Sequence, residues 1–162
     1  QGGTLLKLSL PTLPNLGKIA VNQAVITVAQ VMQNSNLNYT RPFYFIILKR
    51  NADGNLDILS TGDGGSIIDT SGVDIFGNKI ARYNFNISKY MQSISVGTTN
   101  NTDLYLATYR YAGADGTVNV LNSIGTPSIN IGYIPSRVIV AGSNYSDPRF
   151  KLKFNLTYTL IR

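Results

Sequence analysis

An unbroken alternation of apolar and polar side chains near the end of the chain restricts the fold more than any other feature. From residue 150 to residue 160 every second side chain is apolar, and those between are lysine, asparagine or threonine. A period of two places the two sets on opposite faces of a β-strand. One face is then dry and the other wet, as in an antiparallel sheet that covers a core. The chain must therefore build at least one such sheet.

Other segments predict further strands. Residues 81–88 alternate in the same way, and so do Leu6, Leu8 and Leu10 before Pro11 ends the pattern. Residues 21–31 and 43–48 carry apolar side chains on both faces of an extended chain. They indicate central strands covered on both faces, or strands with a helix or loop packed on the outer face. Residues 103–110 and 137–141 complete the predicted set.

Turn signals separate these strands. Glycine next to Asp, Ser or Asn marks turns at residues 53–54, 63–65, 71–72, 76–78 and 115–116. Residues 111–135 have only weak patterning and several glycines, and we expect a long surface excursion there.

One segment predicts a helix. Ile87, Tyr90, Met91 and Ile94 follow the i, i+3, i+4, i+7 spacing of an apolar helix face. Asn86 or Ser88 can accept a first-turn N–H, and Gly97 can end the helix. We expect this short helix to seal a sheet edge or one end of a sandwich.

Seven or eight predicted strands and one helix favour a single all-β domain over residues 1–162, a jelly-roll-like β-sandwich. The alternative is an eight-stranded outer-membrane barrel, which requires strands of about ten residues throughout. The two-sided apolar run at 43–48 and the short segment at 137–141 disfavour that alternative. Since the chain starts with Gln rather than Met, we expect a mature product or a fragment of a longer exported protein whose export signals lie upstream.

The residue types that the chain lacks exclude several kinds of chemistry. There is no His, Cys, Trp or Glu, and all eight acidic residues are Asp. Thiol catalysis, histidine acid–base catalysis, the usual zinc and haem sites and disulfides are thereby excluded. We expect a protein that is not an enzyme and uses no metal or cofactor. The net charge of +6 is scattered along the chain, which disfavours nucleic acid as a partner.

The remaining polar residues are typical of an extracytoplasmic surface protein. The chain contains 17 Asn, 14 Thr, 13 Ser and 15 Gly, which favour turns and the wet faces of sheets. Five Asn-x-Ser/Thr sequences, at Asn38, Asn86, Asn100, Asn144 and Asn155, follow from this composition and do not by themselves indicate glycosylation.

Two acidic segments have both a functional and a structural interpretation. Asn51, Asp53, Asn55 and Asp57 offer oxygens at the alternate positions of a calcium loop, but Asp-Gly also favours a tight hairpin, which we prefer. Asp63, Asp69 and Asp74 could form an acid–base pair for sugar hydrolysis, and solvated loop residues are the preferred interpretation.

Tyrosines suggest a candidate ligand site. Tyr109 and Tyr111 flank Arg110, and on a strand both rings share one face, where a sugar can stack. Together with Tyr133 and Tyr145 they make up a candidate carbohydrate platform; the simpler interpretation is one core face and ordinary surface tyrosines. Lys151 and Lys153 lie on the wet face of the last strand and are expected to deter edge-to-edge aggregation.

Several segments resemble a known family. The sequences FNISKY at 85–90, RVIVAG at 137–142 and KLKFNLTYT at 151–159 are similar to motifs in the C-terminal part of a Bacteroidetes family of predicted surface lipoproteins of unknown function. The resemblance implies export, an upstream lipid-bearing Cys and outer-membrane or cell-surface attachment. The pattern is also loosely similar to jelly-roll modules of secreted polysaccharide-active proteins.

We therefore expect a non-catalytic cell-surface module with a structural or adhesive role, which docks with other envelope proteins through a sheet face or edge. Such a role predicts an exposed apolar patch or an open strand edge. The alternative is a carbohydrate-binding module that uses the surface tyrosines.

Overall fold

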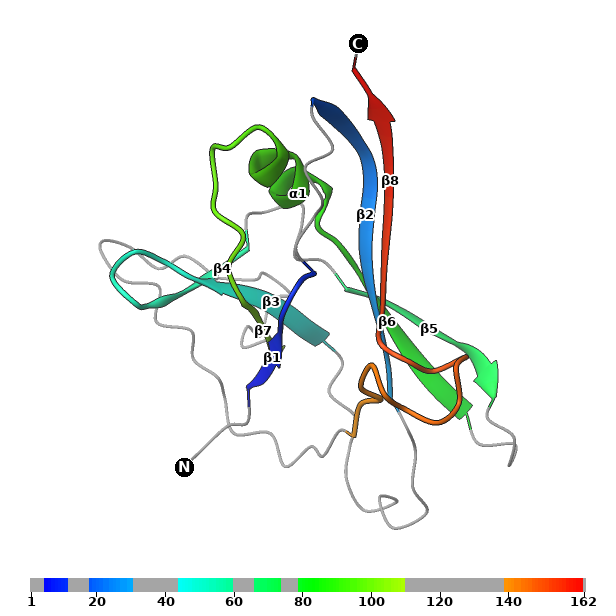
Figure 1. Ribbon diagram of the computed structural model, residues 1–162. Helices are drawn as coiled ribbons and strands as arrows, with labels where there is room; N and C mark the ends of the chain where they lie inside the picture. The colour runs from blue at the N-terminus through cyan, green and yellow to red at the C-terminus, as the bar shows by residue number, and fades with distance from the viewer. Residues whose placement is uncertain are drawn as a thin grey trace, which may run out of the picture.

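The computed structural model describes residues 5–11, 18–30, 44–59, 66–73, 79–109 and 139–161. These form eight strands and one helix (Figure 1). In chain order they are β1 (Leu6–Leu8), β2 (Ile19–Ala29), β3 (Tyr44–Arg50), β4 (Leu56–Ile58), β5 (Ser66–Val73), β6 (Lys79–Asn86), α1 (Ser88–Ser95), β7 (Leu104–Tyr109) and β8 (Lys153–Leu160).

The strands form two antiparallel sheets of four strands each. Sheet 1 has the order β1-β7-β3-β4, and sheet 2 has the order β5-β6-β2-β8. Every strand pair in both sheets is antiparallel. The prediction of an all-β, sandwich-like fold with one short helix is therefore confirmed.

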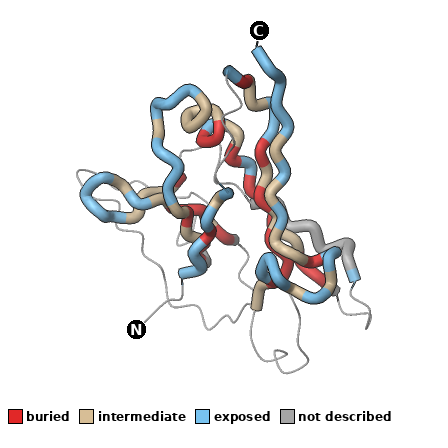
Figure 2. Tube along the Cα trace, in the orientation of Figure 1, coloured by how far each residue is buried: buried red, intermediate tan, exposed pale blue. Residues whose placement is uncertain are grey.

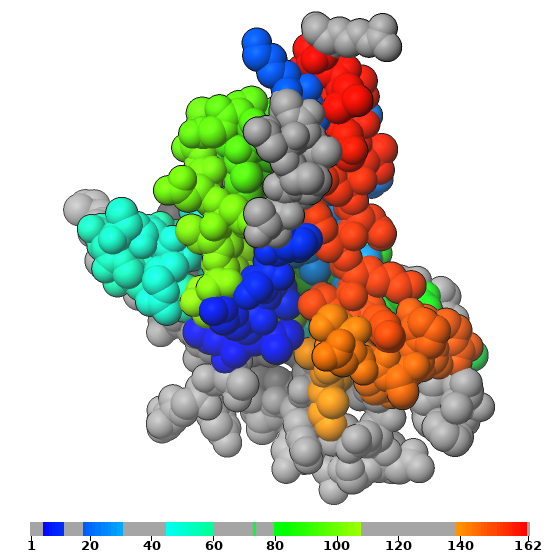
Figure 3. Space-filling view, viewed as in Figure 1, coloured from blue at the N-terminus to red at the C-terminus, as the bar shows by residue number. Residues whose placement is uncertain are grey.

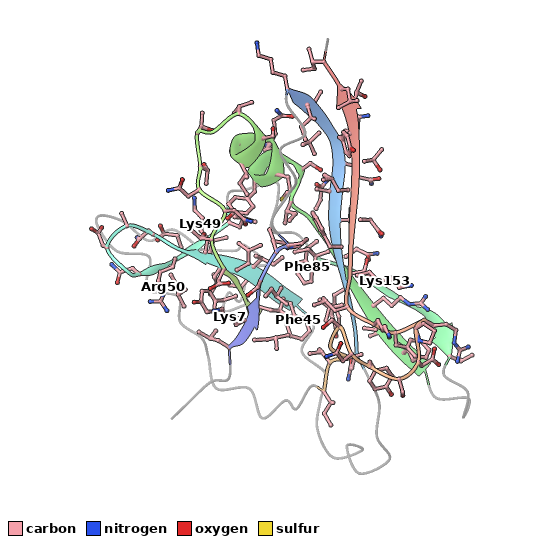
Figure 4. The ribbon with its side chains drawn as sticks, viewed as in Figure 1. Lys7, Phe45, Lys49, Arg50, Phe85 and Lys153 are labelled. Carbon is pink, nitrogen blue, oxygen red and sulfur yellow. The ribbon has the colours of Figure 1, made fainter. Side chains whose placement is uncertain are left out.

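The main core lies between the two sheets. Sheet 1 contributes Leu8, Phe45, Ile47, Leu104 and Leu106, and sheet 2 contributes Ala24, Ile26, Val28, Ala81, Tyr83 and Phe85. The Phe45 and Tyr83 rings meet edge to face across the core, with centroids 4.5 Å apart. Phe45 and Phe85 both point into the space between the sheets (Figure 4), and buried segments of both sheets face this space (Figure 2).

Strand β3 is buried on both faces, as its continuous apolar run predicts. Ile47 belongs to the main core, while Leu48 points to the opposite face and is also 0% exposed. Ala107 on the neighbouring strand β7 is likewise only 2% exposed. Strand β2 differs, because Asn22 and Gln23 are exposed and Val25 and Thr27 are only half-buried on its outer face. Strand β2 is therefore a central strand, since it lies between β6 and β8, but its outer face is only partly covered.

Helix α1 forms where the sequence predicts. The N-cap residue is Ile87 rather than the expected Asn86 or Ser88, while the Asn86 side-chain oxygen accepts the Ser88 N–H at 3.0 Å just before the first turn. Gly97 follows the helix with a φ of +77°, a conformation that favours glycine, and its N–H donates to the Ile94 carbonyl. Tyr90 and Met91 are buried in the main core.

The helix completes the hydrogen bonding of β2 where β6 no longer runs beside it. Strand β6 pairs with β2 only from Val25 to Ala29. Before Val25, the Ala24 N–H donates to Ser88 Oγ at 2.9 Å and the Val21 N–H donates to Gln92 Oε1 at 2.7 Å. Gln92 Nε2 in turn donates to the Ile19 carbonyl at 3.3 Å. The helix thus seals a sheet edge, as predicted.

Two predictions about the remaining segments change. Residues 66–73 form strand β5, where a turn at 71–72 and a loop residue at Asp69 were expected, and the pairing register shifts between Asp69 and Gly72. The glycine therefore marks a β-bulge, which inserts an extra residue without ending the strand. Of the strand predicted at 137–141, residues 139–141 are described, and in them Val140 forms an isolated bridge to Gln30. The predicted excursion at 111–135 lies outside the described residues.

The substitution Gln92→Ala tests the edge seal. It leaves the part-buried Val21 N–H and Ile19 carbonyl without these partners, and we expect the free energy of unfolding to fall by about 1–3 kcal/mol. Ser93→Ala, which removes a hydrogen bond within the same helix to the Lys89 carbonyl, is the matched control and should change it by less than about 0.5 kcal/mol. Urea denaturation measures both values. Equal effects of the two substitutions would show that Gln92 does not support β2.

Candidate interaction surface

The residues predicted to bind a ligand do not form a platform within the described part of the chain. Tyr109 is the last residue of β7 and pairs with Tyr44 of β3. Tyr145 lies far along the chain, half-buried in the segment before β8. Arg110, Tyr111 and Tyr133 lie outside the described residues, so the carbohydrate platform stays a prediction.

Tyr145 belongs to a loop that folds over the outer face of sheet 2. The Leu152 N–H donates to the Gly142 carbonyl at 3.3 Å and closes this loop at its base. Phe150 packs with Ala29, Ile80 and Ala141 in a second apolar cluster, against which Tyr145 rests. Ala29 and Ile80 alternate with main-core residues along β2 and β6, so this cluster lies on the opposite face of the sheet. Tyr145 therefore has a packing role here.

Two guanidinium groups lie against the Phe150 ring. The Arg149 and Arg82 guanidinium carbons are 5.0 Å and 5.9 Å from the ring centroid, within the range of cation–π attraction. Arg149 also binds the Asp147 carboxylate through Nε and Nη2, the latter at 2.7 Å. These contacts fix the loop on the sheet.

Residues 51–57 contain the preferred hairpin turn between β3 and β4. The Gly54 N–H donates to the Asn51 carbonyl at 3.1 Å, and Gly54 has a φ of +83°. Asn51 Oδ1 accepts the N–H groups of Asp53 and Asn55, so two backbone donors occupy this oxygen. No group of three or more acidic side chains able to hold a metal occurs among the described residues.

The carboxylates with shifted pKa values are surface ion-pair partners. A hydrogen bond from Lys7, together with one from Ser9, holds the pKa of Asp103 below its ordinary value. Side-chain and backbone hydrogen bonds from Arg149 lower the pKa of Asp147 in the same way. A general acid requires a raised pKa. Both groups are instead held ionised, and they suit a structural role. Of the other candidate acids, Asp63 and Asp74 lie outside the described residues, and Asp69 is described only as part of β5.

Strand β8 is an edge strand of sheet 2 in the described part of the chain. Strand β8 pairs with β2 along its whole length and has no other neighbour among the described strands. The Ile161 N–H donates to the Lys18 carbonyl, so odd-numbered residues of β8 turn their backbone groups toward β2. The backbone N–H and C=O groups of the even-numbered residues therefore point outward, away from β2; these residues are Phe154, Leu156, Tyr158 and Leu160.

The apolar face of β8 is covered at one end only. Phe154 and Leu156 pack against the main core. Farther along the same face, Tyr158 is 38% and Leu160 62% exposed, and the adjoining Ile161 is 55% exposed. The β2–β8 pair projects past the rest of the sheet (Figure 1), and β8 lies at the surface throughout its length (Figure 3). The sequence predicted that this face is buried as far as Leu160, but its far end is exposed. The alternation of apolar and polar residues does not show how far the opposing sheet extends.

The other edges of the sheets are less suited to pairing. Strands β1 and β4 contain three residues each, and β5 is interrupted by its bulge. Short edge strands and bulges are features with which proteins protect edges from unwanted pairing. Strand β8 continues for eight residues, and its only charged residue is Lys153 at its start (Figure 4).

No family model, curated protein or solved structure matches the chain. Within the described residues no helix is long and apolar enough to cross a bilayer.

The ion pair between Lys7 and Asp103 predicts a pH dependence. Because folding lowers the pKa of Asp103, the stability from this pair is present above the ordinary carboxyl pKa and is lost as the pH falls through the lowered value. We expect Asp103→Asn to lower the thermal midpoint slightly at about pH 7 and to match the wild type near about pH 2. Asp53→Asn, on the exposed turn, controls for the lost charge. A thermal midpoint of Asp103→Asn that lies below that of the wild type by the same amount at every pH would show that the Lys7–Asp103 pair does not cause the difference.

Proposed function

We propose that this domain is a non-catalytic protein-interaction module that takes an extended segment of another protein onto the outer edge of β8. The observation that carries the proposal is an eight-residue edge strand with one neighbour among the described strands and an exposed apolar end. An added strand would satisfy the outward backbone groups and cover Tyr158 and Leu160. This is the recognition mode known as β-augmentation.

The chemistry of the chain supports a binding role. The sequence has no His, Cys or Glu, and among the described residues the two acidic groups with shifted pKa values, Asp103 and Asp147, are paired with cations at the surface. The rigid scaffold needed to hold an edge in place is present, because the core and the helix fix β2 and β2 fixes β8.

We further propose that the module works at the cell surface or outer membrane of a bacterium, as part of a lipoprotein that assembles with other envelope proteins. Its support is the Asn-, Thr-, Ser- and Gly-rich composition, the absence of cysteine and the resemblance of the strand motifs to surface lipoproteins. Anchorage would depend on a lipid-bearing residue upstream of this chain.

The substitution Tyr158→Pro tests the proposal. Proline at position 158 removes the outward N–H and leaves the hydrogen bonds between β8 and β2 intact. An edge strand tolerates proline at such a position. The probe is a fluorescent peptide of about nine residues with alternating Val and Thr, long enough to span β8. We expect Tyr158→Pro to weaken its binding, measured by fluorescence anisotropy, by about 10-fold or more.

Two control variants complete the experiment. Tyr158→Val keeps the backbone N–H and should bind within about 3-fold of the wild type. Thr159→Pro removes an N–H that faces β2, so it should lower the thermal midpoint, which Tyr158→Pro should leave nearly unchanged. Peptide binding that is absent in the wild type, or unaffected by Tyr158→Pro, would refute the proposed function.

A further inference from the structure

The charges around the β8 edge have one sign. Strands β2 and β8 contain no acidic residue. Lys153 begins β8, and the exposed Lys18 lies beside Ile161 at the other end. These positions are eight residues apart along β8, which corresponds to about 27 Å at a rise of ~3.4 Å per residue. An added strand would therefore pass a lysine near each of its ends.

The middle and the far end of this edge require apolar contacts. Tyr158, Leu160 and Ile161 are exposed large apolar side chains, and no charged side chain of β8 lies between Lys153 and Ile161. Thr157 and Thr159 alternate with Tyr158 and Leu160, so the threonines lie on the opposite, wet face. A strand that matches this surface has apolar side chains on one face and small polar ones on the other.

These charges disfavour a second copy of the chain as the occupant. In an antiparallel pair centred on Thr157, Lys153 of one copy would lie opposite Ile161 of the other, next to that copy's Lys18. The lysines of the two copies would then repel each other across the new pair, and each chain already carries a net charge of +6.

Resting on the proposed function, we infer that the partner is an extended segment of another protein with an apolar, alternating centre and carboxylates at both ends. Lys153 contacts the carboxylates at one end and Lys18 those at the other. The outward N–H and C=O groups of β8 bond the centre of the segment. The lysines thus select a partner and disfavour self-pairing at the same edge.

The test compares three peptides of about nine residues that share one Val/Thr centre and carry Asp, Ser or Lys pairs at both ends, with the full chain as receptor. At about 50 mM salt we expect the Asp-flanked peptide to bind about 10-fold more tightly than the Ser-flanked peptide, and the Lys-flanked peptide to bind most weakly. At about 500 mM salt the difference between the Asp- and Ser-flanked peptides should shrink to about 2-fold or less.

Matched variants locate the effect. The double variant Lys18→Gln/Lys153→Gln should abolish the preference for Asp-flanked peptide, whereas Lys49→Gln/Lys89→Gln, with the same change in net charge, should keep it. Equal affinities of the wild type for the Asp- and Ser-flanked peptides, both sensitive to Tyr158→Pro, would overturn the inference and leave the proposed function standing. Absence of binding by all three peptides would overturn both. A dimer that forms through β8 and that Tyr158→Pro dissociates in sedimentation equilibrium would overturn the choice of occupant.

Discussion

Strand β2 is hydrogen-bonded along both of its edges, and this requirement determines where β6, β8 and α1 lie. Buried or part-buried backbone groups must find partners. Strand β8 supplies them along one edge, from Ile19 to Thr27. On the other edge β6 pairs only with Val25 to Ala29, and Ser88 and Gln92 of α1 bond backbone groups of Ala24, Val21 and Ile19. The helix thus takes the place of a neighbouring strand beside the first half of β2. It begins directly after β6 ends at Asn86.

This arrangement explains why the accessible edge is on β8. The side of β2 that faces the helix is closed by side chains, which cannot extend the sheet further. The side that faces β8 is closed by a strand, which presents a new edge of its own. Elsewhere the sheets end in short strands or a bulge, so β8 is the described edge best suited to accept another strand. The lysines near its two ends limit self-pairing and leave an acidic segment as the matching partner.

The sequence predicted the elements whose periodicity is strong, and it failed where the outcome depends on distant parts of the chain. The alternation before Leu160 and the spacing of Ile87, Tyr90 and Met91 are local patterns, and both elements form as predicted. The turn predicted at Ser71–Gly72 was wrong because glycine is favoured both in turns and in β-bulges, and here it marks a bulge. The exposure of Leu160 could not be predicted, because it depends on how far sheet 1 extends. Of the predicted tyrosine platform, only Tyr145 has a described side chain, and it packs on the loop at residues 142–152.

Strand addition at β8 requires that the outward backbone groups of this strand are open to solvent in the free protein. Amide hydrogen exchange of the free protein, followed residue by residue by NMR, measures this openness. We expect alternation along the strand, with slow exchange at Thr157, Thr159 and Ile161 and fast exchange at Tyr158 and Leu160. Slow exchange at all of these amides in the monomer would show that the edge is already covered and that β8 cannot accept another strand.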